Sequence, residues 1–164
     1  MSNNKGTAEL LELNKLISIV LDLLHGEMVS QNIPLQLDFT DELPPIMAGQ
    51  TEVQQSIINL IINAIEAQQQ TDPQKRCLRI TTKHDPGNNC IVVTIRDCGT
   101  GISEEKLQHI FDPYMTTKAD GMGMGLAICR RIAESYQGRL WAENNPDSGA
   151  SFHLSFPVAG EKND

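Results

Sequence analysis

Residues 57–68 read IINLIINAIEAQ, an almost wholly aliphatic stretch with two asparagines four positions apart, Asn59 and Asn63. Asparagine is a poor helix former because its carboxamide competes for backbone hydrogen bonds. Buried without a partner, such a group costs about 1–3 kcal/mol. Residues i and i+4 lie one above the other on a helix. Two asparagines on the same side of an aliphatic helix therefore raise the question of a functional role for that side.

The polar positions of this helix form one narrow stripe, with isoleucine and leucine on both sides. One interpretation is the solvent-facing side of an amphipathic helix. The other is a pocket for a hydrated hard cation, because Mg²⁺ often takes only one or two protein oxygens and keeps water and phosphate as its other ligands. The stripe consists of Glu52, Ser56, Asn59, Asn63, Glu66 and Gln70.

Periodicity, turn residues and caps predict the remaining elements. Because hairpins dominate, we expect an α/β two-layer sandwich, with a mixed, mostly antiparallel sheet and about three helices on one face. The expected elements are a helix over 9–31, a strand over 34–40, a helix from a Thr51–Gln54 capping box to about Gln70, a hairpin of 77–84 with 90–97, a short helix capped by Ser103, a helix over 124–138 with Gly138 at its C′ position, and a hairpin of 139–144 with 150–156.

The chain has 164 residues and a formal net charge of −8, with 40% hydrophobic and 21% charged residues. These values are typical of one globular domain. The negative charge argues against a nucleic-acid or anionic-membrane surface, since both attract basic patches.

The four cysteines, Cys77, Cys90, Cys98 and Cys129, show no CxxC pairing. We expect them to be reduced thiols of a cytosolic protein. The sequence has no signal-peptide pattern and no apolar run near the ~18 residues of a membrane span. A cytoplasmic location is therefore expected.

Residues 97–102, DCGTGI, place a carboxylate at a strand end, followed by two glycines. The segment fits a plain turn. It also fits a binding loop in which Gly99 and Gly101 let a ligand approach the backbone, while Asp97 accepts a hydrogen bond from a ligand amino group.

Residues 120–132, DGMGMGLAICRRI, place three glycines directly before a helix. Free N–H groups and the helix dipole at such a start attract an anion. The segment is neither a Walker loop nor a dinucleotide fingerprint, and a glycine hinge remains the alternative. Lys118, just upstream, is either a cation for a phosphate or an ordinary surface lysine.

These segments, in this order, resemble the ATP-binding catalytic domain of sensor histidine kinases of bacterial two-component systems. The superfamily also holds type II topoisomerases, mismatch-repair ATPases and heat-shock chaperones, which share a Bergerat-type fold. The resemblance covers about residues 9–158, so that 1–8 and 159–164 are expected to be terminal tails. Its motifs are NLIINAIEA (59–67) as N box, DCGTGI (97–102) and GMGMGLAI (121–128) as glycine boxes, FDPYMTTK (111–118) as F box, and SGASF (148–152) as the final strand signature.

The resemblance implies that the domain binds ATP and Mg²⁺. Asn63 would ligand the metal, while Asn59 and Lys118 would act beside the phosphates. The implied binding residues are Asn59, Asn63, Glu66, Ala67, Asp97, Gly99, Gly101, Ile102, Phe111, Tyr114, Lys118, Gly121, Met122, Gly123, Met124, Gly125, Leu126 and Ser151.

At the other end of the nucleotide, the resemblance implies that Asp97 binds adenine with help from the Ser151 hydroxyl. The segment from about Ser103 to Asp120 would form a lid over the phosphates, anchored by Phe111 and Tyr114.

The resemblance further implies transfer of the γ-phosphoryl group to a histidine on a dimerisation domain, and through the parent kinase to a response regulator. None of the four histidines has the His-Glu-x-x-x-Pro context of the acceptor, so we expect an excised, monomeric catalytic domain without activity alone. We expect it to contact neither membrane nor nucleic acid. A free-standing serine kinase of the anti-sigma-factor type and a clamp ATPase are the alternatives. Clamp ATPases carry a glutamate where this chain has Asn59, and anti-sigma kinases usually lack the FxPYxTTK stretch.

Overall fold

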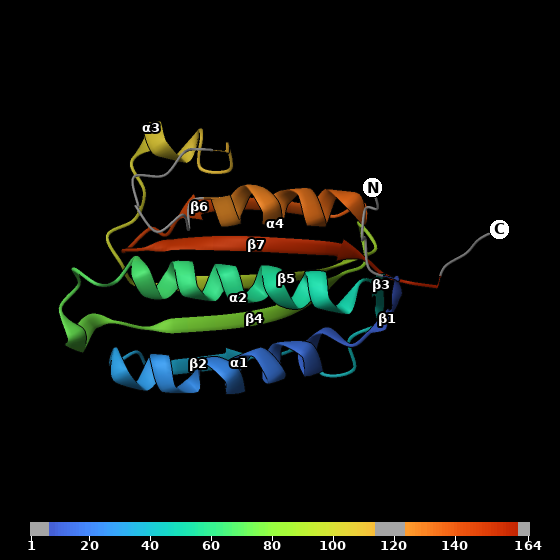
Figure 1. Cartoon of the computed structure of the whole chain (residues 1–164), viewed down its shortest axis with the longest axis horizontal. Coiled ribbons are helices and arrows are strands. Elements are labelled where there is room, and N and C mark those ends of the chain that lie inside the picture. The colour runs from blue at the N-terminus through green and yellow to red at the C-terminus, as the bar shows by residue number, and fades with distance from the viewer. Residues whose placement is uncertain (1–6, 114–123, 161–164) are drawn as a thin grey trace.

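A computed structural model describes residues 7–113 and 124–160, which form a five-stranded sheet with three long helices side by side on one face (Figure 1). The strand order is β2-β4-β5-β7-β6, and only β2 and β4 run parallel. The expected two-layer sandwich with a mixed, mostly antiparallel sheet is confirmed. The elements are β1 (Glu9–Leu11), α1 (Leu13–Ser30), β2 (Leu35–Asp38), β3 (Ile46–Ala48), α2 (Gln50–Glu66), η1 (Pro73–Lys75), β4 (Leu78–Asp85), β5 (Cys90–Asp97), α3 (Glu104–Leu107), α4 (Met124–Ser135), β6 (Arg139–Asn144) and β7 (Ala150–Pro157).

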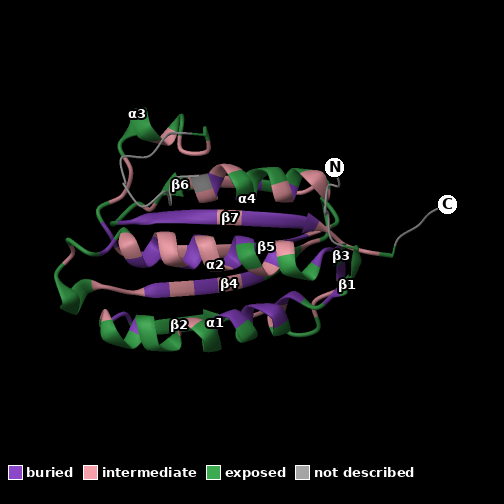
Figure 2. Ribbon diagram, in the orientation of Figure 1, coloured by how far each residue is buried: buried purple, intermediate pink, exposed green. Residues whose placement is uncertain are grey.

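The core lies between the sheet and the helices, with α2 in the middle (Figure 2). Strand β5 alternates strictly between partly exposed and buried residues, as the period of two in a strand requires. Helix α2 packs against α1 on one side and α4 on the other, which explains its aliphatic residues around most of its circumference. No helix within the described ranges has the length and hydropathy of a membrane span.

The helix expected over residues 9–31 is shorter than predicted. Residues Glu9–Leu11 form β1, which pairs antiparallel with Ile46–Ala48, a strand that periodicity missed. Leu10, which fits the helical pattern, is 60% exposed. Three-residue strands are too short for a period of two to stand out, and only their pairing satisfies the backbone.

The capping box predicted at Thr51 is wrong. Helix α2 begins at Gln50 with Gly49 as N-cap, and no side chain caps it. A Cβ on Gly49 would lie 2.8 Å from both a Glu52 carboxylate oxygen and the Tyr136 hydroxyl oxygen, so these two side chains crowd the N-cap position. The helix also ends at Glu66, before the expected Gln70.

The end of α4 differs from the prediction by one residue. Gln137, at φ 63°, is the left-handed C′ residue. The N–H of Gly138 donates to the Ala133 carbonyl at 2.7 Å, and that of Gln137 donates to the Glu134 carbonyl at 3.0 Å. This is a Schellman motif with Gly138 at C″. Glycine is required there because a Cβ would lie 2.0 Å from the Ser155 carbonyl oxygen in β7.

The expectation of four free thiols is wrong for two cysteines. Cys77 and Cys98 form a disulfide, whereas Cys90 and Cys129 are free. The two bonded residues lie 21 positions apart in the sequence. The hairpin of β4 and β5 brings them together, which no local spacing reveals.

We predict that Gly138→Ala destabilises the fold by about 1–3 kcal/mol, because the new methyl group forces α4 away from β7. The matched control is Gly26→Ala on the exposed side of α1, where a Cβ meets nothing within 4 Å. The control should stabilise the helix by up to about 1 kcal/mol. Urea denaturation of both variants measures the difference, and equal stabilities would contradict the assigned packing.

Candidate functional site

The polar stripe of α2 faces the start of α4. Asn59, Asn63 and Glu66 line one pocket together with Gly125 and Leu126. All five are among the expected binding residues. Three of the six stripe residues therefore line a pocket between α2 and α4, whereas Ser56 is buried and Gln70, beyond the end of the helix, is exposed.

Contacts from both helices hold the Asn59 carboxamide in place. Its Oδ1 accepts a hydrogen bond from the Gln55 side chain at 3.3 Å, and its Nδ2 donates to Cys129 Sγ at 3.8 Å. A Cβ on Gly125 would lie 3.2 Å from the same Nδ2, so a glycine lets α4 approach. Burial raises the pKa of the Cys129 thiol, which keeps this partner uncharged. The carboxamide neither gains nor loses a proton near neutral pH, so it can only orient and hydrogen-bond a ligand.

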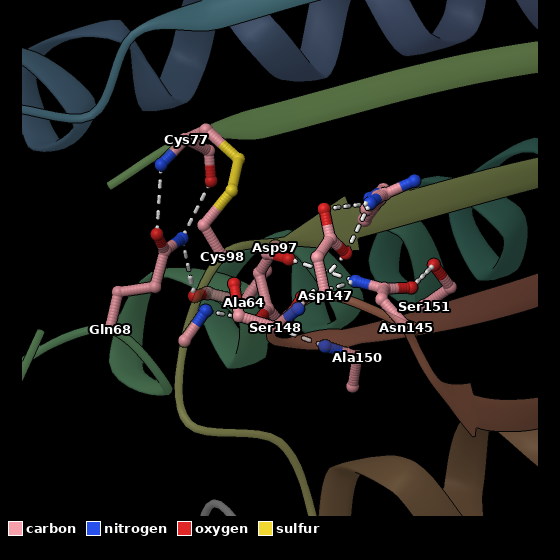
Figure 3. The surroundings of a disulfide bond; sticks show 12 residues. Ala64, Gln68, Cys77, Asp97, Cys98, Asn145, Asp147, Ser148, Ala150 and Ser151 are labelled. Carbon is pink, nitrogen blue, oxygen red and sulfur yellow. Dashed lines mark hydrogen bonds and ion pairs between the residues drawn. A yellow bond between two sulfur atoms is a disulfide. The ribbon is translucent and has the colours of Figure 1, made fainter. Parts of the chain in front are cut away.

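Asp97 ends β5 on the face that packs against the helices and is 1% exposed. Its Oδ1 accepts hydrogen bonds from the amides of Gly99 at 2.8 Å and Ala150 at 3.2 Å (Figure 3). Burial raises the pKa of this carboxyl, and the two amide donors partly oppose that shift. Both bonds use Oδ1, which leaves Oδ2 as the acceptor for a ligand amino group.

Glycines let three segments meet around this carboxylate. A Cβ on Gly99 would lie 2.5 Å from the Ala67 carbonyl oxygen at the end of α2. Gly149 has φ +80°, and a Cβ there would lie 2.1 Å from the Asp97 carbonyl oxygen. Gly149 lies within the SGASF segment, but it was not among the expected binding residues, although its place one residue before β7 is the signal that could have found it.

The rest of the glycine loop is tied to β6. Gly101 adopts φ +84°, which favours glycine. The Asn144 side chain then pairs with both backbone groups of Ile102, accepting from its N–H at 2.8 Å and donating to its carbonyl at 2.7 Å. Asn144 was not predicted from the sequence, because nothing local connects the end of β6 with this loop.

Ser151 does not reach the Asp97 carboxylate. Its hydroxyl donates to Asn145 Oδ1 at 2.6 Å, and it lines a hollow on the sheet face away from the helices. The Asn145 side chain donates in turn to the Asp97 backbone carbonyl at 3.1 Å (Figure 3). Successive residues of a strand face opposite sides of the sheet, so Ser151 points away from the carboxylate. The backbone amide of Ala150 makes the contact with Asp97 that was expected of the Ser151 hydroxyl.

Part of the expected lid lies in the described residues. Ser103 caps α3 as predicted, accepting from the Lys106 N–H at 3.2 Å. Phe111 packs edge-to-face on Phe152 of β7 at 6.1 Å, with the Arg130 guanidinium 5.6 Å from its ring centre. The expected site residues Tyr114, Lys118, Gly121, Met122 and Gly123, and the side chain of Met124, lie outside the described residues.

The two halves of the site lie along α2. The pocket of Asn59 and Asn63 is at the middle of the helix, and Ala67, beside Gly99, follows its last turn. Eight residues of helix span about 12 Å. The site is therefore elongated, with neutral carboxamides at one end and a buried carboxylate at the other.

Comparison with known proteins gives the family of this chain. Residues 48–160 match the family described as histidine kinase-, DNA gyrase B- and HSP90-like ATPase. The sensor histidine kinase TmoS of Ectopseudomonas mendocina is 36% identical over 149 residues, which are 91% of this chain and 15% of TmoS. The sensor protein FixL of Bradyrhizobium diazoefficiens is 36% identical over 131 residues, 80% of this chain and 25% of FixL.

The solved structures include the catalytic domain of the histidine kinase ThkA, with a TM-score of 0.81 and 32% identity over 92% of this chain and 95% of that one. ThkA in complex with the response regulator protein TrrA matches with a TM-score of 0.79 and 30% identity, over 95% of this chain and 43% of that one.

The mixed sheet under three helices is the fold that this chain shares with the catalytic domain of ThkA. The chain belongs to the histidine kinase-, DNA gyrase B- and HSP90-like ATPase family, as the ATP-binding catalytic domain of a sensor histidine kinase. It spans only about a quarter or less of the length of TmoS and FixL.

We predict that Asp97→Asn stabilises the fold at neutral pH. The amide oxygen can keep the hydrogen bonds from Gly99 and Ala150, and the cost of burying a charge disappears. Burial raises the pKa of Asp97 in the folded state, so its contribution to stability is fully present below the unfolded pKa and is lost as pH rises through the folded pKa. The advantage of Asp97→Asn should therefore grow between about pH 4 and pH 7. Thermal unfolding across that range measures it, and a constant difference would contradict a raised pKa.

Proposed function

We propose that this domain binds Mg·ATP and transfers the γ-phosphoryl group to a histidine on a separate dimerisation domain. The observation that carries the proposal is the pocket of Asn59, Asn63, Glu66, Gly125 and Leu126, with Asp97 of β5 near the C-terminal end of α2. The relatives named as sensor histidine kinases support the choice of histidine as acceptor.

The phosphate end fits a magnesium ion that keeps most of its water and phosphate ligands. Within the described residues, no group of three histidine, cysteine or acidic side chains could form a protein cage for a metal. Asn63 offers one neutral oxygen beside Glu66, which suits Mg²⁺ shared with a triphosphate. When bound, the ion would neutralise charge on the transferred phosphoryl group. Asn59 would orient the phosphates, and the start of α4 at Gly125 would present backbone amides to them.

The base end fits adenine. Asp97 Oδ2 can accept a hydrogen bond from the exocyclic amino group of adenine, whereas guanine would place a carbonyl there. Gly99 and Ala67 bring the backbone of the loop and the end of α2 together beside it. The buried carboxylate thus supplies the specificity, because an unmatched polar group at this depth is costly.

We expect the reacting histidine to come from another domain. His153 is held by Thr94 and Glu143, and His109 by Asp112, while His25 and His84 are exposed at other places on the surface. Asn59 cannot deprotonate water, which disfavours a clamp ATPase. The reaction that we propose is therefore transfer to a histidine on a partner domain. That domain would present the histidine in line with the γ-phosphate, as transfer requires.

The proposed wider role follows from this transfer. We expect the domain to work in the cytoplasm, where ATP is available, and to pass the phosphoryl group to a response regulator through the histidine of its parent kinase. The complex of ThkA with TrrA supports this class of partner. A serine kinase of the anti-sigma-factor type gains no support from TmoS and FixL, which are named as a sensor histidine kinase and a sensor protein.

We predict that the chain binds ATP more tightly than GTP by about 1–3 kcal/mol, which is roughly 5- to 150-fold. Titration calorimetry with both nucleotides in the presence of Mg²⁺ measures the difference. Asp97→Asn should lower the affinity for ATP, since its side chain presents an amide donor to the adenine amino group. Equal affinities for ATP and GTP would remove the role given to Asp97.

We predict that the chain alone is not labelled by γ-³²P-ATP, and that an added dimerisation domain of a sensor kinase becomes labelled on histidine. That label should be acid-labile, unlike phosphoserine. Asn63→Ala should reduce the labelling at least about tenfold by removing the metal ligand.

Asn88→Ala is the matched control for that experiment. It removes a carboxamide in the β4–β5 turn, at the opposite end of the sheet from Asp97, and should leave the labelling unchanged. An acid-stable label on the chain itself, or steady ATP hydrolysis by it, would favour the two alternative classes.

A further inference from the structure

The disulfide lies directly beside the proposed adenine end of the site. Leu78 and Asp97 form the last pair of the β4–β5 ladder. Cys77 precedes the first and Cys98 follows the second, so the two cysteines face each other with their Cα atoms 5.4 Å apart (Figure 3). This separation lies within the usual range for a disulfide. The hairpin register therefore places the bond one residue from the carboxylate.

The bond can be reached from solvent. Both cysteines line a hollow at the surface, which is bordered by Pro34, Arg79 and Arg96. Both are half-buried, in contrast to Cys129, which is fully buried beside Asn59. A small thiol can enter this hollow, and exchange depends on such access.

The Cys98 end of the bond lies inside the turn that orients the carboxylate. The Gly99 amide donates to Asp97 Oδ1 across Cys98, which makes Cys98 the middle residue of this turn. A link at Cys98 therefore restrains the backbone on which Asp97 and Gly99 depend.

The Cys77 end is fixed to α2. The buried side chain of Gln68 accepts from the Cys77 N–H at 2.9 Å, donates to the Cys77 carbonyl at 2.7 Å, and donates to the Ala64 carbonyl at 3.2 Å (Figure 3). The disulfide thereby joins the glycine loop to the helix that carries Asn59 and Asn63. A continuous path of hydrogen bonds and one covalent bond thus runs from α2 through Gln68 and Cys77 to Cys98.

We propose that Cys77 and Cys98 are a thiol–disulfide exchange site that sets the affinity of the adjoining pocket for ATP, an inference that rests on the proposed function. Its reaction partner is a low-molecular-weight thiol and its disulfide, of the glutathione type. In the oxidising direction, one cysteine thiolate attacks the small disulfide and releases one small thiol. The second cysteine attacks the mixed disulfide and releases another, so the two cysteines lose two electrons and two protons to form the bond.

The oxidised form binds ATP more tightly. With the bond closed, the turn at Asp97 is already ordered, and less conformational entropy is lost when adenine binds. With the bond open, the loop is held by non-covalent contacts alone, such as the hydrogen bonds of Asn144 to Ile102 and the packing of Ile102 on the core. By reciprocity, ATP stabilises the disulfide by the same factor.

The first experiment measures ATP affinity of the whole chain by calorimetry, after oxidation and after reduction with dithiothreitol. We expect affinity to be about tenfold weaker in the reduced form. Alkylation followed by mass spectrometry reports the state of the cysteines. Cys77→Ser leaves the glycine loop sequence intact and should bind like the reduced protein under both conditions. Cys90→Ser, at the far end of the same hairpin, should keep the full redox response.

The second experiment needs no variant. The chain is equilibrated with reduced and oxidised glutathione at graded ratios, with and without ATP, and the disulfide fraction is measured by alkylation. A tenfold coupling corresponds to a shift of about 30 mV in the midpoint potential of a two-electron couple, with ATP making the disulfide harder to reduce.

The outcomes separate this inference from the proposed function. Equal ATP affinity in both redox states, or a midpoint that ATP does not move, would overturn the inference and leave ATP binding intact. Tighter binding by the reduced form would overturn the direction assigned here and with it the inference. Absence of ATP binding in both states would overturn the proposed function itself.

Discussion

The burial of one carboxylate constrains much of this domain. Asp97 lies on the buried side of β5. The other residues on that side, Ile91, Val93 and Ile95, belong to the hydrophobic core. A charge at that depth is tolerated only if donors satisfy it, and the donors here are the backbone amides of Gly99 and Ala150. Two loops must therefore fold tightly onto the end of one strand. This approach requires glycine, because a Cβ on residue 149 would collide with the Asp97 carbonyl.

Helix α2 connects this carboxylate with the other half of the site. It is packed between α1 and α4, so that aliphatic side chains cover it on both flanks. The remaining line carries Asn59 and Asn63, which therefore face a pocket between helices. A neutral carboxamide suits this place, because it can bind a cation or a phosphate without the desolvation cost of a buried charge. The same helix thus supplies the core and the ligand-binding wall.

The polar groups near Asp97 lie on both faces of the sheet. The face toward the helices holds the carboxylate, and the opposite face holds Ser151, Asn145 and the disulfide. Neither face is independent of the other. Asn145 donates to the Asp97 backbone carbonyl, and Cys98 lies between Asp97 and Gly99 in the chain. Events on the exposed face can therefore change the geometry of the pocket through the backbone of a single turn.

The sequence alone determined the layered fold and most of the described site, because helical and strand periods, glycine placement and the two asparagines are local signals. It placed Asn59, Asn63 and Glu66 on one line of a helix, and the structure brings the three together in one pocket. Only the tertiary structure decided the contacts that depend on register. A shift of one residue in a strand reverses the face of a side chain, which is why the amide of Ala150, and not the hydroxyl of Ser151, meets the carboxylate, and why Cys77 meets Cys98.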